Sequence, residues 1–312
     1  MDSTQVRSIR FERFHAFILA RQDLLAVGAI LAAVFLWGGS FSAMRVAVQV
    51  MSPWSVMWLR MITATVLLIP LAGKLIPSSY RKGDWKLLIP MVLFQPCLYF
   101  LLESYALQFT TSSQAGVISA ALPLMVAFGA SLVLSESIPR VAYIGLLLSL
   151  LGVACLTVMQ GSAGAAANPL LGNALELGAM VSAAANMIVL KRLCERYNPW
   201  TLTAMQVLAG AIFFLPGLFF MVRAEESYWT PQLVLILLFL GSFVTLGAFG
   251  LYNWGMSHIP ASRASAFINL VPVNAVFFGW ILLGERLSLP QCIAASAVMG
   301  GVWLSQKSRP RR

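Results

Sequence analysis

The segment Ser52-Pro53-Trp54-Ser55 recurs in similar form as Asn198-Pro199-Trp200-Thr201, at a shift of 146 residues. At the same shift three further positions line up between the two parts of the chain: Pro70 with Pro216, Arg45 with Lys191, and Arg60 with Gln206. Self-similarity at a fixed spacing indicates that the chain is built from repeated structural units.

A second pair of matching segments extends the repeat toward the carboxyl terminus. Leu122-Pro123 matches Val271-Pro272 at a shift of 149 residues, and Leu134-Ser135-Glu136 matches Leu283-Gly284-Glu285. An insertion of three residues between the two blocks accounts for the change of shift. We therefore expect two similar halves, residues 24–160 and 170–306, flanked by an amino-terminal tail at 1–23 and a basic tail at 307–312.

The composition excludes a water-soluble protein. Of the 312 residues 59% are hydrophobic and 10% are charged, whereas soluble domains carry about 25% charged residues. The net charge of +10 does not indicate nucleic-acid binding, because the charges lie between apolar runs and no basic stripe with interleaved aromatics is present. The four cysteines are far apart and form no CxxC pair, so we interpret them as packing residues and expect no metal or cofactor.

Apolar runs of about 20 residues, the length needed to cross a bilayer, recur along the chain. Many begin with proline directly after a helix-start residue, as at Asn198-Pro199 and Thr230-Pro231. In the tail, arginines between apolar residues indicate either an amphipathic helix on the membrane surface at residues 4–21 or a disordered basic tail. The sequence predicts an all-α integral membrane protein with ten transmembrane helices, near residues 24–46, 54–72, 87–107, 112–134, 141–160, 170–190, 199–221, 231–257, 261–283 and 288–305.

The distribution of lysine and arginine predicts the orientation in the membrane. Of the 21 basic residues, 17 lie in the two tails and the even-numbered loops, and the other four are Arg45, Arg60, Arg223 and Arg286. Both termini are therefore expected in the cytoplasm, which requires an even number of spans. Because each half has five spans, an odd number, the second half enters the membrane from the opposite face. The two halves are thus expected to form an inverted-topology repeat.

An inverted repeat favours a secondary transporter over other membrane proteins. Such repeats place a substrate site near the bilayer midplane, and rocking of one half against the other gives alternating access. An enzyme is not expected, because HExxH, GxSxG and paired-aspartate motifs are absent from the sequence. A channel would need a polar filter or a charged ring, and the sequence shows neither. A receptor or scaffold would not require the repeat. The sequence contains no nucleotide-binding P-loop, so we expect an ion gradient or the substrate's own gradient as the energy source.

Several short motifs resemble the EamA type of the drug/metabolite transporter superfamily. In the first half these are Trp37-Gly38-Gly39-Ser40-Phe41, Leu59-Arg60, Tyr105-Ala106-Leu107, Ala121-Leu122-Pro123-Leu124 and Leu134-Ser135-Glu136. In the second half they are Pro272, Leu283-Gly284-Glu285-Arg286-Leu287 and Gly300-Gly301. The resemblance covers residues 24–306 and rests on the order and spacing of the motifs.

That resemblance implies two inverted EamA repeats in a multi-pass protein of the bacterial inner membrane, and transport of amino acids or related metabolites. It also implies a central cavity lined by spans 1, 3, 4, 6, 8 and 9, with spans 5 and 10 at the periphery. Substrates differ widely among members, so the resemblance names none. The first six spans contain no histidine, and a histidine-based site is not expected.

Ionisable residues inside a span are costly and are therefore candidates for function. Three are expected within spans, toward the outer third: Arg60, Glu103 and Glu176. We interpret Glu103 as a carboxylate that exchanges protons or binds a substrate amine, with a structural ion pair to Arg60 as the alternative. Glu176 is a further candidate, although it is expected nearer the interface, where it can hydrate. Arg60 is interpreted as a helix-end anchor or the partner of a carboxylate.

Aromatic and neutral polar residues complete the candidate site. Trp37, Tyr99 and Tyr252 are expected on cavity helices, where a ring stacks on a substrate or attracts an ammonium group; the alternative for each is simple packing. Neutral side chains there line the cavity or join helices by hydrogen bonds. The neutral candidates are Ser40, Gln95, Ser119, Asn186, Asn253 and Asn269.

Two pairs of equivalent residues are candidates for gating. Pro123 and Pro272 are expected within spans 4 and 9, where proline removes a backbone hydrogen bond and kinks the helix. We interpret them as gate hinges, with static kinks as the alternative. Glu136 and Glu285 follow the same two spans, which indicates helix-end capping or gate contacts.

The sequence thus predicts an exporter of amino acids or related small metabolites. Its expected partners are a small-molecule substrate, the lipid bilayer and, if transport is coupled through Glu103, protons. An uncoupled facilitator, and a transporter of drugs or other metabolites with the same fold, remain as alternatives. The sequence is compatible with a monomer and with a homodimer.

Overall fold

The computed structural model describes residues 3–307 except 76–79, 135–139, 159–166, 195, 223–228, 257 and 259–266, and it contains no strand in that part of the chain. Glu136 falls outside the described residues, and so does the side chain of Asn253. Helix occupies most of each of the ten ranges that the sequence predicts as spans. The all-helical fold class is therefore confirmed.

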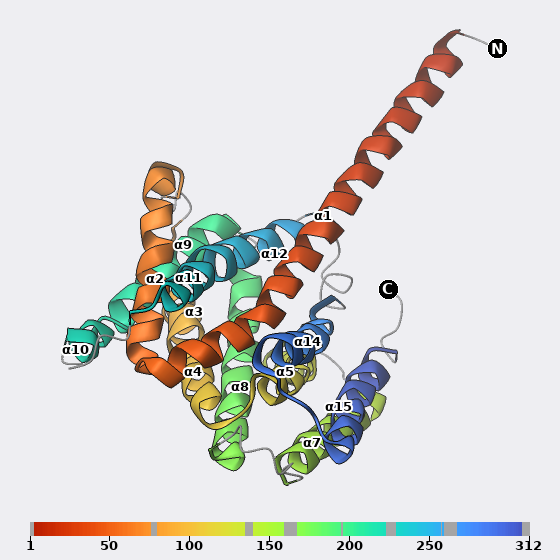
Figure 1. Cartoon of the computed structure of the whole chain (residues 1–312). Coiled ribbons are helices and arrows are strands. Elements are labelled where there is room, and N and C mark those ends of the chain that lie inside the picture. Colours follow the sequence, from red (N-terminus) through yellow and green to blue (C-terminus); the bar gives the residue numbers. More distant parts are fainter. Residues whose placement is uncertain are drawn as a thin grey trace.

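The first half begins with a single long helix. Helix α1 continues without a break from the tail into the first span, so residues 4–21 are helical, and its amino-terminal part projects beyond the other helices (Figure 1). A position of this tail on the membrane surface stays a prediction. The segments of this half are α1 (Ser3–Val50), α2 (Pro53–Leu68), the 3₁₀ segment η1 (Ile69–Lys74), α3 (Trp85–Val92), the π-helical segment η2 (Leu93–Leu98), α4 (Tyr99–Phe109), α5 (Ser112–Ser119), α6 (Leu122–Leu134) and α7 (Arg140–Val158).

The second half follows a similar course along the sequence. Its segments are α8 (Pro169–Cys194), α9 (Pro199–Phe213), α10 (Pro216–Val222), α11 (Pro231–Leu238), the π-helical segment η3 (Phe239–Ala248), α12 (Phe249–Met256), α14 (Val271–Leu283) and α15 (Leu289–Lys307).

Helix starts follow the local signals in the sequence. Asn198 accepts a hydrogen bond from the backbone N–H of Trp200, and Thr230 accepts one from that of Leu233. Each of these side chains satisfies a backbone donor that has no partner inside the helix, and the proline that follows needs none. Helices α9 and α11 consequently begin at the prolines that the sequence singled out.

Five helical segments are long and apolar enough to cross a membrane, as judged over the described residues. They are Asp23–Val50, Pro53–Gly73, Trp85–Phe109, Pro169–Cys194 and Pro231–Tyr252. Large apolar side chains such as Ile212, Leu235 and Leu147 are exposed on the outside of the bundle. An apolar outer surface of this kind is suited to lipid rather than to water.

The helical runs α3–α4 and α11–α12 each contain a π-helical segment near their middle, and the first of these segments is also interrupted. In η2, Gln95 has non-helical backbone angles (φ −146°, ψ 120°) and is followed by Pro96. The residues equivalent to η2 at the shift of 149 are 242–247, which lie within η3. Interrupted helices inside a membrane bundle are tolerated where protein surrounds them, and π-helical segments occur frequently at functional sites.

Small residues let helices of the two halves approach closely. A Cβ atom at Gly38 of α1 would collide with Asn274 of α14, and one at Gly116 of α5 would collide with Ala275 of the same helix. Close approach through small residues is the usual way in which helices associate in membranes. Away from this contact, α7 and α15 lie side by side at one edge of the bundle (Figure 1).

Candidate functional site

One group of polar residues, most of them buried, lies where α2, η2 and α4 of the first half meet α8, α9 and η3 of the second. We call this region the central seam and define it by Arg60, Gln95, Tyr99, Glu103, Glu176, Asn186, Gln206 and Thr245. In the seam, polar side chains from helices of both halves contact one another inside an otherwise apolar bundle.

Two carboxylates of the seam lie on α4 and α8. Glu103 is buried and accepts a hydrogen bond from the Tyr99 hydroxyl at 2.6 Å. Glu176 is completely buried, and neither of its oxygens has a hydrogen-bond partner among the described residues. The two carboxylates are near enough to interact electrostatically. The sequence placed Glu176 near the interface, where it could hydrate, but in the structure its side chain is fully buried. Helix α8 packs closely on α4, with Gly172 against Thr110 just after that helix.

Arg60 reaches from α2 into the seam and is 2% exposed. Its Nε donates a hydrogen bond to Thr245 Oγ1 at 2.5 Å, and its guanidinium lies 4.3 Å from the ring centre of Phe100. Arg60 interacts electrostatically with Glu103, but no ion pair within 4.0 Å joins them. The ion pair that we considered as the alternative role for Glu103 is therefore not formed as a direct contact.

Three amide side chains connect the interrupted run of the first half to the second half. Asn186 Nδ2 on α8 donates to Gln95 Oε1 at 3.0 Å. Gln206 Nε2 on α9 donates to the backbone carbonyl of Gln95 at 2.9 Å, and lies 3.3 Å from Asn186 Oδ1. Ser182 donates to the carbonyl of Phe94 at 2.8 Å. The bond from Gln206 supplies a donor to the carbonyl of Gln95, whose backbone angles are non-helical. The carbonyl of Phe94 accepts from Ser182 in addition to the backbone N–H of Tyr99.

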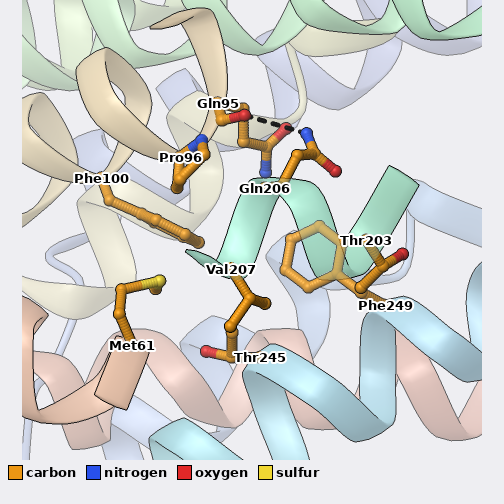
Figure 2. A pocket seen from close by; sticks show the side chains of 9 residues that line it. All are labelled: Met61, Gln95, Pro96, Phe100, Thr203, Gln206, Val207, Thr245 and Phe249. Atoms are coloured by element: carbon orange, nitrogen blue, oxygen red, sulfur yellow. Dashed lines mark hydrogen bonds between the residues drawn. The ribbon is translucent and has the colours of Figure 1, made fainter. Parts of the chain in front are cut away.

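A small cavity of about 20 Å³ lies between these groups (Figure 2). That volume holds about one water molecule. Its wall contains three pairs of residues that are equivalent under the repeat: Met61 with Val207, Pro96 with Thr245, and Phe100 with Phe249. Gln95, Thr203 and Gln206 complete the wall. The cavity is thus lined by corresponding parts of both halves.

Aromatic rings border the seam on the side of α1. Trp37 packs against Phe249 at 5.4 Å and Tyr252 at 5.0 Å between ring centres. Its indole Nε1 is buried and has no hydrogen-bond partner among the described residues, and the same is true of Asn269 Oδ1. Buried polar atoms are nearly always hydrogen-bonded, so such exceptions need an explanation. All four exceptions found in the described part of the chain belong to Trp37, Glu176 and Asn269, which the sequence had selected.

Two other predicted residues form hydrogen bonds within their own helices. Ser40 donates to the carbonyl of Trp37 at 2.7 Å, and Ser119 to that of Gly116 at 2.7 Å. These intrahelical bonds satisfy the hydroxyl groups.

Pro123 and Pro272 are the second residues of α6 and α14, so the helix is interrupted just before each of them. Their role as gate hinges stays a prediction.

A larger apolar groove of about 640 Å³ lies between α1, α11 and α14. Phe35, Leu235 and Leu282 line it, and each is strongly exposed on the outer surface. None of the predicted substrate or coupling residues lines this groove. We therefore place the candidate site at the central seam, where the polar groups are, despite the smaller volume there.

A further contact between the halves centres on Glu285, just after the end of α14. Its carboxylate accepts hydrogen bonds from the backbone N–H and hydroxyl groups of Ser112 and Ser113, at 2.6–3.0 Å. Arg45 Nε lies 3.4 Å from Glu285 Oε1. The left-handed conformation of Gly284 (φ 66°) ends α14 and brings Glu285 to the start of α5. This contact, which we call the Glu285 cap, confirms the expected helix-end capping.

Near the start of α3 and the end of α8 lies another charged contact, which involves residues that the sequence did not single out. Asp84 Oδ1 is 2.6 Å from Arg196, and Asp84 Oδ2 accepts a hydrogen bond from the Tyr197 hydroxyl at 2.7 Å. The hydrogen bond from Arg196, followed by that from Tyr197, holds the pKa of Asp84 far below its usual range. Burial and the bond to Asp84 raise the pKa of Tyr197 to about 12.

Gln206 and Thr245 are the seam residues that sequence reasoning missed. A signal for Gln206 existed, because it is the repeat equivalent of Arg60. Thr245 gave no signal, since a threonine inside an apolar run is unremarkable until the partner that approaches it is known.

The fold and the seam define a polytopic helical membrane protein whose two similar halves meet at a buried polar site. The sequence profile of the EamA-like transporter family matches residues 24–158 and 170–306, which covers both halves. This chain belongs to the EamA-like transporter family, and the resemblance seen in its motifs is confirmed.

Relatives with similar sequences span nearly the whole chain. YetK of Bacillus subtilis, an uncharacterized transporter, is 26% identical over 94% of this chain and 91% of its own length. An uncharacterized transporter of Archaeoglobus fulgidus is 29% identical over 88% of this chain and 96% of its own. WAT1-related protein At3g02690 of Arabidopsis thaliana is 25% identical over 86% of this chain and 66% of its own length. A protein of known crystal structure shares the fold, with a TM-score of 0.58 and 17% identity over 91% of this chain and 96% of that one.

Proposed function

We propose that this chain is a secondary transporter that exports amino acids or related small metabolites across the bacterial inner membrane. Its family and the names of its relatives support transport as the class of function. Export, the amino-acid substrate and the inner membrane are our own inferences from the motifs and from the seam.

The proposed architecture has ten spans in two inverted five-helix halves, with both termini in the cytoplasm. Besides the five long spans, four shorter apolar helices occupy predicted span positions: Ser112–Val126, Pro199–Phe213, Val271–Leu283 and Leu289–Gly301. Helix α7 completes the ten. The concentration of 17 of the 21 basic residues on one side supports the orientation. In this arrangement the Glu285 cap faces the periplasm and the Asp84 contact faces the cytoplasm.

A single observation carries the substrate proposal: Trp37, Glu176 and Asn269 have buried polar atoms that find no hydrogen-bond partner among the residues that the structure describes. Trp37 offers a hydrogen-bond donor, whereas Glu176 and Asn269 offer acceptors. A ligand that satisfies both kinds must itself carry acceptors and donors, as an amino acid does. The rings of Phe249 and Tyr252 pack against Trp37 and add an apolar surface beside its indole, suited to a side chain of the ligand.

We further propose that transport is coupled to protons through Glu103. Carboxylates inside membrane bundles are the usual proton carriers of pumps and transporters. The hydrogen bond from Tyr99 orients Glu103, and Glu176 lies near enough to influence its charge. Entry of a substrate ammonium group changes the electrostatic environment of both carboxylates, which links substrate binding to proton exchange.

Reconstitution in liposomes tests the transport proposal. We expect uptake or efflux of labelled amino acids above that of empty liposomes, and equal flux for Arg286→Gln, which changes an exposed residue outside the seam. Absence of flux for amino acids and for every other metabolite class screened would refute transport.

The uncoupled facilitator is the alternative to proton coupling. Replacing Glu103 with Gln preserves the size of the side chain and its ability to accept from Tyr99, but removes the exchangeable proton. We expect Glu103→Gln to abolish the pH dependence of flux. If the variant keeps the full pH dependence of the wild type, coupling through Glu103 is wrong and the facilitator is favoured.

A further inference from the structure

Arg60 and Gln206 occupy equivalent positions in the two halves and make equivalent contacts. Each lies on the second helix of its half and reaches the π-helical segment of the opposite half. Arg60 bonds to Thr245 in η3, and Gln206 bonds to the backbone carbonyl of Gln95 in η2. The two contacts lie at the same cavity, where Gln95, Gln206 and Thr245 all line the wall (Figure 2).

This pair provides an internal comparison of a charged and a neutral side chain in one role. The bridge to the opposite half needs only a hydrogen-bond donor, because the neutral amide of Gln206 supplies it. Burying a charged guanidinium inside a membrane is costly, and a neutral amide avoids the cost of burying a charge. Joining the halves therefore does not explain the positive charge at position 60.

The surroundings of Arg60 leave that charge without a contacting anion. Among the described residues its side chain makes one hydrogen bond, through Nε to a neutral hydroxyl, and one contact with an aromatic face. Four further N–H donors remain on the planar guanidinium, in a geometry that matches a carboxylate. Glu103 interacts with it only over a longer distance than an ion pair.

We infer that Arg60 binds the carboxylate of the substrate. The inference rests on the proposed transport of amino acids and adds the recognition chemistry: Arg60 takes the carboxylate, while the Glu103 and Glu176 pair takes the ammonium group. Glu176 supports this because it is a completely buried carboxylate without any partner in the described structure. The seam thus combines a cation and two carboxylates, which matches a zwitterion rather than a simple amine or a polyanion.

The rival explanation is that Arg60 only balances the charge of Glu103. Under this explanation the residue never touches the substrate, and removing both charges together restores normal recognition. The two explanations therefore differ in the behaviour of the double variant Arg60→Gln with Glu103→Gln.

Competition in proteoliposomes separates these possibilities. The probes are the amino acid that gives flux, its α-amide and its decarboxylated amine; for leucine these are leucinamide and isoamylamine. The wild type should prefer the amino acid over both by roughly 10–100-fold, since a site built for a polar group strongly rejects analogues that lack it. Arg60→Gln, which copies the residue of the other half, should reduce this preference at least about tenfold, and Arg60→Lys should retain part of it.

Thr245→Val is the matched control, because it removes the hydrogen-bond partner of Arg60 while the charge remains. It should keep the preference for the carboxylate, as should Arg286→Gln. In the double variant the preference should stay lost, because restoring charge balance does not restore the binding group. Size-exclusion profiles and melting temperatures of all variants in the same detergent verify folding.

Three outcomes would overturn the inference. One is a wild type that does not distinguish the amino acid from its amide, a result that needs no variant. Another is an Arg60→Gln protein that is folded and keeps the wild-type preference, and a third is a double variant that regains it. By contrast, a wild type that transports no amino acid at all refutes the proposed function itself.

Discussion

Removing the carboxylate of Glu285 should destabilise the contact between the two halves. The cap satisfies two backbone N–H groups in the first turn of α5, and losing a cap of this kind costs about 0.5–2 kcal/mol. The hydroxyls of Ser112 and Ser113 and the guanidinium of Arg45 also lose a charged acceptor, and each such bond contributes about 1.5–3 kcal/mol. Because these bonds share one carboxylate and are not additive, we expect Glu285→Ala to cost about 2–4 kcal/mol in total.

Thermal unfolding of the purified protein measures this loss. A destabilisation of that size should lower the melting temperature by roughly 5–15 °C, because each kcal/mol lowers it by about 2–4 °C in a protein of this length. The melting temperature of Glu285→Gln should lie between those of the wild type and the Ala variant. The amide of Gln keeps one acceptor oxygen, but its N–H donors would face the N–H and hydroxyl donors of Ser112 and Ser113. Arg286→Gln, the exposed neighbour, is the control and should change stability by less than about 0.5 kcal/mol. If Glu285→Ala is as stable as Arg286→Gln, the Glu285 cap does not join the halves as described.

Three further changes should have defined effects. Gly279→Ala places a Cβ 2.6 Å from Glu285 Oε2, so it should disturb the same cap and lower the melting temperature by an amount corresponding to about 1–3 kcal/mol. The pKa of Asp84 is lowered in the folded protein, so its contribution is complete above the usual carboxyl pKa and fades as pH falls below about 4. The melting-temperature gap between wild type and Asp84→Asn should therefore narrow on acidification; a constant gap would contradict this. Gln206→Leu leaves the carbonyl of Gln95 without its donor and should lower amino-acid flux at least about tenfold without altering the carboxylate preference.

Helix boundaries could be predicted because their causes are local. Proline and a capping side chain act within a few residues, so the starts of α9 and α11 follow directly from Asn198-Pro199 and Thr230-Pro231. The repeat extended this success, since the same landmarks appear twice and support each other. The interruption at η2 had a signal in Pro96, whereas η3 contains no proline and was not expected.

Site contacts were harder to predict because they join residues far apart in the sequence. Arg60 and Thr245 are separated by 185 positions, and Glu285 and Ser112 by 173. The cost of burying charge identified Glu103 and Glu176 as candidates without any knowledge of their neighbours. Which neighbours they meet depends on helix rotation and on glycine-mediated approaches such as that of α8 to α4, and the sequence does not encode these in any local pattern.

Simultaneous measurement of amino-acid flux and internal pH in proteoliposomes tests the central claim most directly. Vesicles loaded with an amino acid and a trapped pH-sensitive dye report both movements after dilution into amino-acid-free buffer. For the wild type we predict efflux accompanied by a change of internal pH, and for Glu103→Gln we predict no pH change above that of empty vesicles. Wild-type vesicles that release no amino acid would contradict transport, and a Glu103→Gln protein with the wild-type pH change would contradict the role of Glu103.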